Sequence, residues 1–283
     1  LYRYACCTFF PSEDLFLAPI PRPREPCYNR AIMHNKPFIA RLGQDRLFWI
    51  VVVAIGVAYL LLQRGSALPL VATLLSLLVA ITVHECAHAW SAAQLGDPTA
   101  RLQGRVTLNP LAHLDPLGTV MMVITTLTGV GIGWGKPVPV SPWRLKFGSR
   151  RGNALVALAG PASNLLAAAL VSLLLRLVLA LTPLSRTAAF FFQALMMTNV
   201  VIAFFNLLPL PPLDGSSVLV GLLSLSRSNW AFQAIQFMDR LARYGFMLLI
   251  GLVLLSQFLR LNLLGWAVVT PARWVYSLLL IGL

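Results

Sequence analysis

The chain has 283 residues, of which 58% are hydrophobic and 11% are charged, and its mean hydropathy is +0.77. This balance fits a multi-spanning membrane protein and excludes an ordinary soluble domain of this length. The net charge of +13 does not indicate nucleic acid, because the lysines and arginines flank apolar spans, where they suit topology signals and contacts with anionic lipid.

The chain begins with a polar, proline-rich stretch, residues 1–46, which contains seven Lys or Arg residues. We expect this N-terminal tail to be disordered. The first apolar span covers residues 47–62, with Arg46 and Arg64 at its ends. Sixteen residues are few for a transmembrane helix. We therefore expect the flanking arginines to lie at the two membrane interfaces and to mark the ends of this span.

The second span, residues 68–95, carries the sequence His84-Glu85-Cys86-Ala87-His88 toward its C-terminal end. One helical turn separates the two histidines, so both imidazoles project from one face and can share a metal ion. Zinc in such a site lowers the pKa of a water molecule to about 7, and the neighbouring Glu85 carboxylate can accept its proton. The pattern therefore indicates a zinc hydrolase inside an apolar segment.

A structural role for these residues is the alternative, since a single His or Glu on an apolar helix is usually a hydrogen-bonded core residue. Here three such residues occur together, in a chain with only four His and three Glu. Three ionisable groups in a membrane segment are costly and need a partner such as a metal ion. Cys86 points away from the histidine face, so we expect it to pack and not to bind metal.

The region after the second span has two unusual parts. Residues 101–116 alternate at Leu102, Gly104, Val106 and Leu108, which predicts a short strand or hairpin. Residues 117–133 are apolar but contain four glycines, which disfavours a plain helix. If this segment dips into the membrane and returns, 17 of the 22 Lys and Arg lie on the side of the N-terminus, against 13 if it crosses fully. The positive-inside rule therefore favours a re-entrant segment, a cytoplasmic N-terminus and a metal toward the cytoplasmic side.

The remaining chain alternates apolar spans with basic or broken stretches. The apolar spans cover residues 152–181, 188–208 and 244–259. The expected fold is an all-α polytopic protein of the cell membrane, with five to six transmembrane helices and a re-entrant or short β segment after the histidine helix. We expect three parts: the tail at 1–46, a membrane core at 47–260 and an apolar C-terminal segment at 261–283.

A zinc site needs a third ligand. No glutamate follows Glu85, so the candidates are one histidine and four aspartates: His113, Asp97, Asp115, Asp214 and Asp239. His113 and Asp115 lie in a proline-bounded loop, where both suit a turn. Asp214 follows a proline-broken stretch at the end of an apolar span, where freed carbonyls need protein or a wet cavity around them. We therefore favour Asp214.

Three motifs together resemble the site-2 protease family of intramembrane zinc metalloproteases. HECAH at 84–88 and NLLPLPPLDG at 206–215 match that family's HExxH and NxxPxPxLDG motifs, and GPASN at 160–164 resembles its GPxxN element. The resemblance covers about residues 47–260. No connecting stretch is long enough for the PDZ or CBS domain that many members carry, so we expect a minimal form.

The resemblance implies a catalytic assignment. It makes His84, His88 and Asp214 the ligands of one zinc ion and Glu85 the general base. It also implies that Asn164 faces the substrate and binds the developing oxyanion, with an interhelical hydrogen bond as the alternative.

The implied substrates are transmembrane proteins, cleaved within or near their membrane segments in regulated intramembrane proteolysis. A substrate helix must unwind locally, and we expect Asn206, Pro209 and Pro211 to bind it, because the proline-broken segment can offer carbonyls to an extended chain.

Two other classes of protein remain as alternatives. A membrane metal transporter would also place His and Asp between helices, but it has no use for Glu85 as a base. A non-catalytic scaffold that holds zinc for stability would lose its fold when the ligands are removed. The sequence does not define the substrate, the cleavage position or the oligomeric state.

Overall fold

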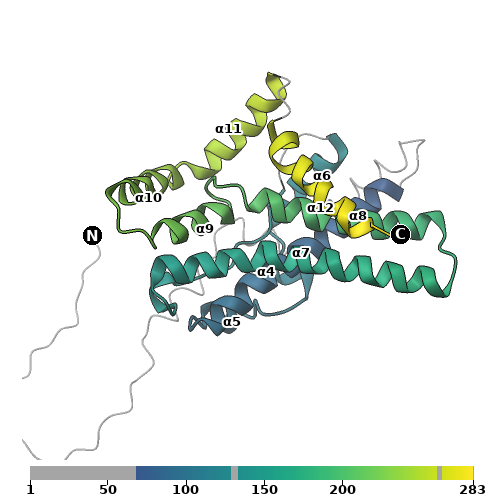
Figure 1. Cartoon of the computed structure of the whole chain (residues 1–283), viewed down its shortest axis with the longest axis horizontal. Coiled ribbons are helices and arrows are strands. Elements are labelled where there is room, and N and C mark those ends of the chain that lie inside the picture. Colours follow the sequence, from purple (N-terminus) through teal and green to yellow (C-terminus); the bar gives the residue numbers. More distant parts are fainter. Residues whose placement is uncertain (1–67, 129–132, 260–262, 283) are drawn as a thin grey trace, which may run out of the picture. The chain divides into compact units, whose positions relative to one another are not determined.

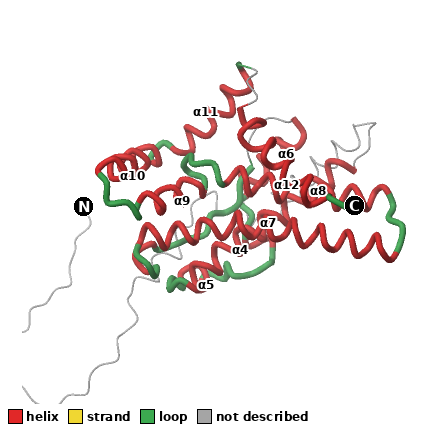
Figure 2. The backbone as a smooth tube through the Cα atoms, in the orientation of Figure 1, coloured by secondary structure: helices red, strands yellow, loops and turns green. Residues whose placement is uncertain are grey.

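The computed structural model describes residues 68–128, 133–259 and 263–282. Within these ranges every named element is a helix and no strand is formed (Figure 1, Figure 2). The expected tail and first span lie outside the described residues. The all-helical class is therefore confirmed for the described part of the chain.

Three helices are long and apolar enough to cross a membrane: α4 (Leu68–Gln94), α7 (Ser149–Leu181) and α8 (Arg186–Asn206). At 1.5 Å per residue they are about 40, 50 and 31 Å long, against a hydrocarbon core of about 30 Å. Each of the three contacts the other two. Fully buried alanines on all three helices, Ala80, Ala168 and Ala203, let their backbones approach closely.

The ends of these helices follow from local sequence. After α4 the chain turns at Gly96, whose φ of +106° suits glycine, and Pro98 precedes the four-residue α5 (Thr99–Leu102). α8 begins after Ser185, whose hydroxyl accepts a hydrogen bond from the Ala188 amide. These turns allow α4, α7 and α8 to lie against one another.

The other helices are shorter. They are α6 (Pro116–Thr128), α9 (Asp214–Leu223), α10 (Asn229–Ala242), α11 (Gly245–Phe258) and α12 (Thr270–Leu280), with the short turns η1 (Pro110–Ala112), η2 (Pro142–Arg144) and η3 (Gly265–Val269). The 13 residues of α6 span about 20 Å, too little to cross the hydrocarbon core. The described residues thus contain three candidate spans, and the expected total of five to six stays a prediction.

The predicted strand over residues 101–116 is wrong. After α5 the stretch continues as loop around η1, and no strand is drawn among the described residues (Figure 2). An isolated bridge joins Leu114 to Gly135. The alternation was misleading because its apolar members Leu102 and Leu108 are exposed, whereas Arg105 between them is only 4% exposed. A half-buried strand requires the opposite arrangement.

Candidate metal centre

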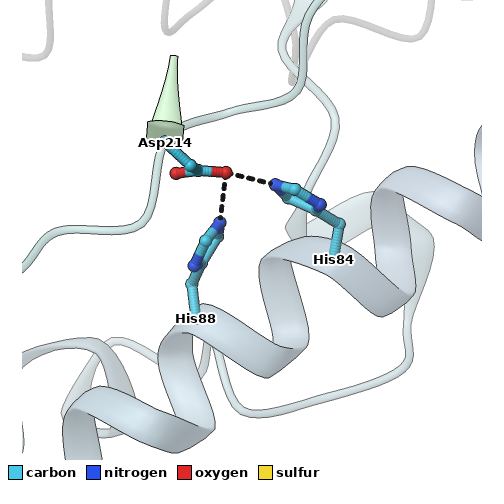
Figure 3. Close-up of side chains that lie close together, drawn as sticks. All are labelled: His84, His88 and Asp214. Atoms are coloured by element: carbon cyan, nitrogen blue, oxygen red, sulfur yellow. Dashed lines mark hydrogen bonds and ion pairs between the residues drawn. The ribbon is translucent and has the colours of Figure 1, made fainter. Parts of the chain in front are cut away.

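Two histidines of α4 converge on an aspartate at the start of α9, as Figure 3 shows. His84 Nε2 lies 3.0 Å and His88 Nε2 lies 3.3 Å from the same carboxylate oxygen, Oδ2 of Asp214. Both histidines are buried. Among the His, Cys, Asp and Glu side chains that the structure describes, these three form a group able to hold a metal ion.

The second nitrogen of each imidazole is held by another protein group. His88 Nδ1 donates to the carbonyl oxygen of Val156 at 2.7 Å, and His84 Nδ1 donates to Oδ1 of Asn164 at 2.6 Å. A carbonyl oxygen only accepts, so a neutral imidazole here carries its proton on Nδ1 and turns the Nε2 lone pair toward Asp214. Two lone pairs and a carboxylate oxygen then converge, an arrangement that a cation between them stabilises.

This donor set fits zinc, which is commonly bound by neutral imidazole and carboxylate. Ligand atoms about 2.0–2.1 Å from a tetrahedral zinc ion lie about 3.3 Å apart. The distances of 3.0 and 3.3 Å in this centre are close to that spacing. Three protein ligands leave a fourth position for water, as in catalytic zinc sites and unlike closed structural ones.

Glycine allows α7 to approach the two imidazoles. A side chain at Gly160 would collide with the rings of both His84 and His88. Pro161 follows inside the helix, and Asn164 lies one turn further on. In the sequence GPASN the glycine therefore makes room for the two imidazoles and the asparagine holds that of His84.

Asn164 is fully buried behind His84. Its amide donates to the carbonyl oxygen of Ala80 and to Oδ1 of Asn199, each at 2.9 Å. Asn199, on α8, is also fully buried and donates to Leu195 O at 2.8 Å. A hydrogen-bonded path thus runs from Asn199 on α8 through Asn164 on α7 to His84 on α4.

Asn199 was not found from the sequence. Its only signal was a polar amide within an apolar span, which marks many interhelical hydrogen bonds without indicating which ones reach a functional site.

Asp214 is positioned by the turn that precedes α9. Gly215 lies so close to the carbonyl oxygens of Leu207 and Leu208 that a side chain there would collide with both. As the first residue of α9, Asp214 also sits at the positive end of the helix dipole, which favours a carboxylate. Both effects hold the carboxylate toward α4.

A cavity of about 710 Å³ opens beside the three proposed ligands. Its lining includes Glu85, next to His84, and Asn206, whose amide donates to Ile202 O at 3.0 Å. Pro209 and Pro211 are not among the lining residues; Pro209 is exposed and Pro211 is buried. The volume lies within the usual range for small-molecule sites, about 300–1,000 Å³.

Comparison with known proteins found a matching family and several similar proteins. The model of peptidase family M50 matches residues 182–252. "Putative zinc metalloprotease YwhC" of Bacillus subtilis is 43% identical over 155 residues, which cover 53% of this chain and 68% of that protein. Proteins named "Putative zinc metalloprotease Rip2" from Mycolicibacterium smegmatis and Mycobacterium tuberculosis are each 34% identical, over 50% of this chain and 53% of their own length. No solved structure matches the chain.

Proposed function

Because the chain belongs to peptidase family M50 and is a membrane zinc metalloprotease, we propose that it hydrolyses peptide bonds within or near transmembrane segments of membrane-protein substrates. One observation carries this proposal. His84, His88 and Asp214 converge beside Glu85, inside a group of long apolar helices and next to a cavity large enough for an extended peptide.

The residues around the centre have distinct roles in this reaction. His84, His88 and Asp214 hold the metal, and Glu85 on the cavity wall accepts a proton from water and returns it to the leaving amine. Zinc, when bound, supplies the Lewis acid that activates the water and polarises the scissile carbonyl.

The other ring nitrogens keep the ligands in place. Val156 O fixes the tautomer of His88, and Asn164 fixes that of His84. Because both amide hydrogens of Asn164 are already donated to protein, we assign it the orientation of His84 in preference to oxyanion binding.

A substrate helix hides its peptide bonds in its own hydrogen bonds, so it must unwind before it is cut. Of the three residues that we expected to bind substrate, only Asn206 lines the cavity, where it can contact the unwound chain. Pro209 and Pro211 act more indirectly, by keeping the turn between α8 and Asp214 open. Pro211 packs against Gly245 at the start of α11, which also borders the cavity.

We place the metal toward the cytoplasmic side of a multi-pass protein of the cell membrane. Basic segments lie where α4 ends and α7 begins: Lys146 N donates to Leu95 O, and Arg151 donates to Ser224 O after α9. The positive-inside rule orients this end toward the cytoplasm. Cysteine labelling of intact cells tests it, and reaction of residues 136–151 from outside the cell would reject this orientation.

The function is tested with the purified chain in detergent and a model single-span substrate, with bound zinc measured in parallel. Wild type is expected to cleave, and Glu85→Gln is expected to keep its zinc and lose cleavage. A wild type that holds zinc and cleaves none of a panel of substrates would contradict the proposal. Transport by both proteins would then favour a metal transporter, and unfolding on zinc removal without any activity would favour a scaffold.

A further inference from the structure

Arg105 is a buried cation outside the candidate metal centre. It is only 4% exposed, and among the ion pairs of the described residues none includes it. Its guanidinium instead donates to three backbone carbonyl oxygens, those of Ala112, Lys136 and Pro137, the last at 2.8 Å. Burying a charge is costly unless its donors find partners. These bonds use both terminal nitrogens of Arg105, while its buried Nε has no hydrogen-bond partner.

Two of the three carbonyls that Arg105 holds, those of Lys136 and Pro137, belong to a segment that forms one wall of the cavity. Residues 133–140, the wall segment, form no helix or strand and supply several lining residues: Gly133, Trp134, Gly135, Pro137, Val138 and Val140. Proline has no N–H, so a segment with Pro137 and Pro139 is anchored mainly through its carbonyl oxygens. Arg105 takes two of these, and Lys136 N donates to His113 O at 2.7 Å.

The same wall segment lies directly against Glu85. A Cβ atom added to Gly135 would lie 3.3 Å from Glu85 Oε1 and 2.8 Å from Ile81 Cγ2, so only glycine permits this approach. Any displacement of residues 135–137 therefore changes the space that the Glu85 carboxylate occupies. Burial lowers the pKa of Arg105, and the negative charge of Glu85 opposes that shift, so the two groups also attract each other.

From these contacts we infer that Arg105 is a positioning residue: it holds residues 135–137 against Glu85 and thereby fixes the carboxylate beside the metal centre. This inference rests on the proposed function, in which Glu85 is the general base. It assigns a role in catalysis to a residue outside the three motifs and outside the cavity lining.

Replacing Arg105 with lysine tests the positioning role separately from the positive charge. Lys keeps the positive charge but replaces a rigid planar fork with one flexible ammonium, which cannot hold carbonyls from two segments in the same geometry. For Arg105→Lys we expect kcat to fall about 10- to 100-fold, because small misplacements of catalytic groups have effects of that size. KM should stay within about twofold, since substrate binding is not lost.

Arg101→Gln is the matched control, because it removes an exposed arginine four residues away and should leave kcat and KM unchanged. Bound zinc and melting temperature are measured for every variant. A purely structural role predicts that Arg105→Lys loses activity only in proportion to lost zinc or lost folded protein. Normal kcat in folded, zinc-loaded Arg105→Lys would overturn the inference.

Gly135→Ala provides a second variant if Arg105 substitutions fail to fold. Its added methyl acts on Ile81 and Glu85 directly, so kcat should fall while zinc is retained; unchanged kcat would also overturn the inference. Wild type and Glu85→Gln distinguish failure of the proposed function from failure of the positioning role of Arg105. If wild type does not cleave, or Glu85→Gln cleaves equally well, the proposed function fails; if those two behave as expected and Arg105→Lys is normal, only the positioning role fails.

Discussion

The two sides of the cavity are built in different ways. On the ligand side, long helices pack closely and side chains hold side chains, as in the path from Asn199 through Asn164 to His84. On the other side, the wall segment has no regular structure, and the buried Arg105 holds its carbonyl oxygens at Lys136 and Pro137. The buried carboxylate of Asp97 holds the next residue, Ser141, by accepting a hydrogen bond from its amide. The proposed metal ligands thus depend on helix packing, whereas the position of the proposed base depends on loop anchors.

Removing the carboxylate ligand should have the largest effect. Asp214→Ala leaves two histidines without the oxygen that joins them, so bound zinc and cleavage should both fall to background. Zinc per chain and substrate cleavage measure this. Asp239→Ala, at an exposed position 3.9 Å from Arg150, should leave both unchanged. Full zinc and activity in Asp214→Ala would reject the ligand assignment.

Gly160→Ala should disturb the ligand side without removing a ligand. Its methyl group would push into both imidazoles, and we expect zinc affinity to fall about 10- to 100-fold, the range for changes in groups that orient metal ligands. Gly251→Ala in α11 is the matched control, because no atom lies within 4 Å of the added carbon. Competition with a chelator measures the affinity, and equal affinity of the two variants would contradict the packing argument.

The asparagine path should give smaller, coupled effects. Asn164→Ala removes the acceptor of His84 Nδ1 and should weaken zinc binding about tenfold, while Asn199→Ala, one step further away, should weaken it about threefold. The double variant should resemble Asn164→Ala alone, because Asn199 acts through Asn164. Independent, additive losses in this double-mutant cycle would show that no such path operates.

Asp97→Asn should disturb the loop around Ser141. We expect it to reduce the stability of the protein more than it reduces substrate cleavage. Burial raises the pKa of the Asp97 carboxyl, but hydrogen bonds from Thr99 and the Ser141 amide, with the charge of Arg144, outweigh it and lower the pKa below its ordinary value of 3.8. The stabilisation is therefore complete above about pH 4 and is lost as pH falls through the lower, folded-state pKa.

At pH 7 we expect Asp97→Asn to lower the free energy of unfolding by about 1–3 kcal/mol, as for other buried, charge-assisted hydrogen bonds. Melting curves of both proteins between pH 7 and pH 3 provide the measurement. The difference should shrink below pH 4, and a constant or growing difference would mean that the carboxylate charge is not what stabilises the wall segment.

Predictions that depend on residues close together in the chain succeeded more often than those that depend on tertiary contacts. Spans at 152–181 and 188–208 correspond to α7 and α8 within a few residues, because a run of apolar residues is a local property. The strand at 101–116 failed because alternation alone does not say which members face inward, and here Leu102 and Leu108 face out while Arg105 is buried. Residues 244–259 do form a helix, α11, but its 14 residues are fewer than a full crossing needs.

Composition and residue spacing were sufficient to predict the helical class, the membrane character and the face shared by His84 and His88, because these depend on overall hydropathy and on spacing within one turn of helix. The sequence also singled out Asp214 by its motif. Only the tertiary structure brought Asp214 across 130 residues to the histidines, turned Asn164 toward His84, and placed Arg105 behind the wall segment. Such contacts form only when distant segments pack, so they cannot be predicted from the spacing of residues along the chain.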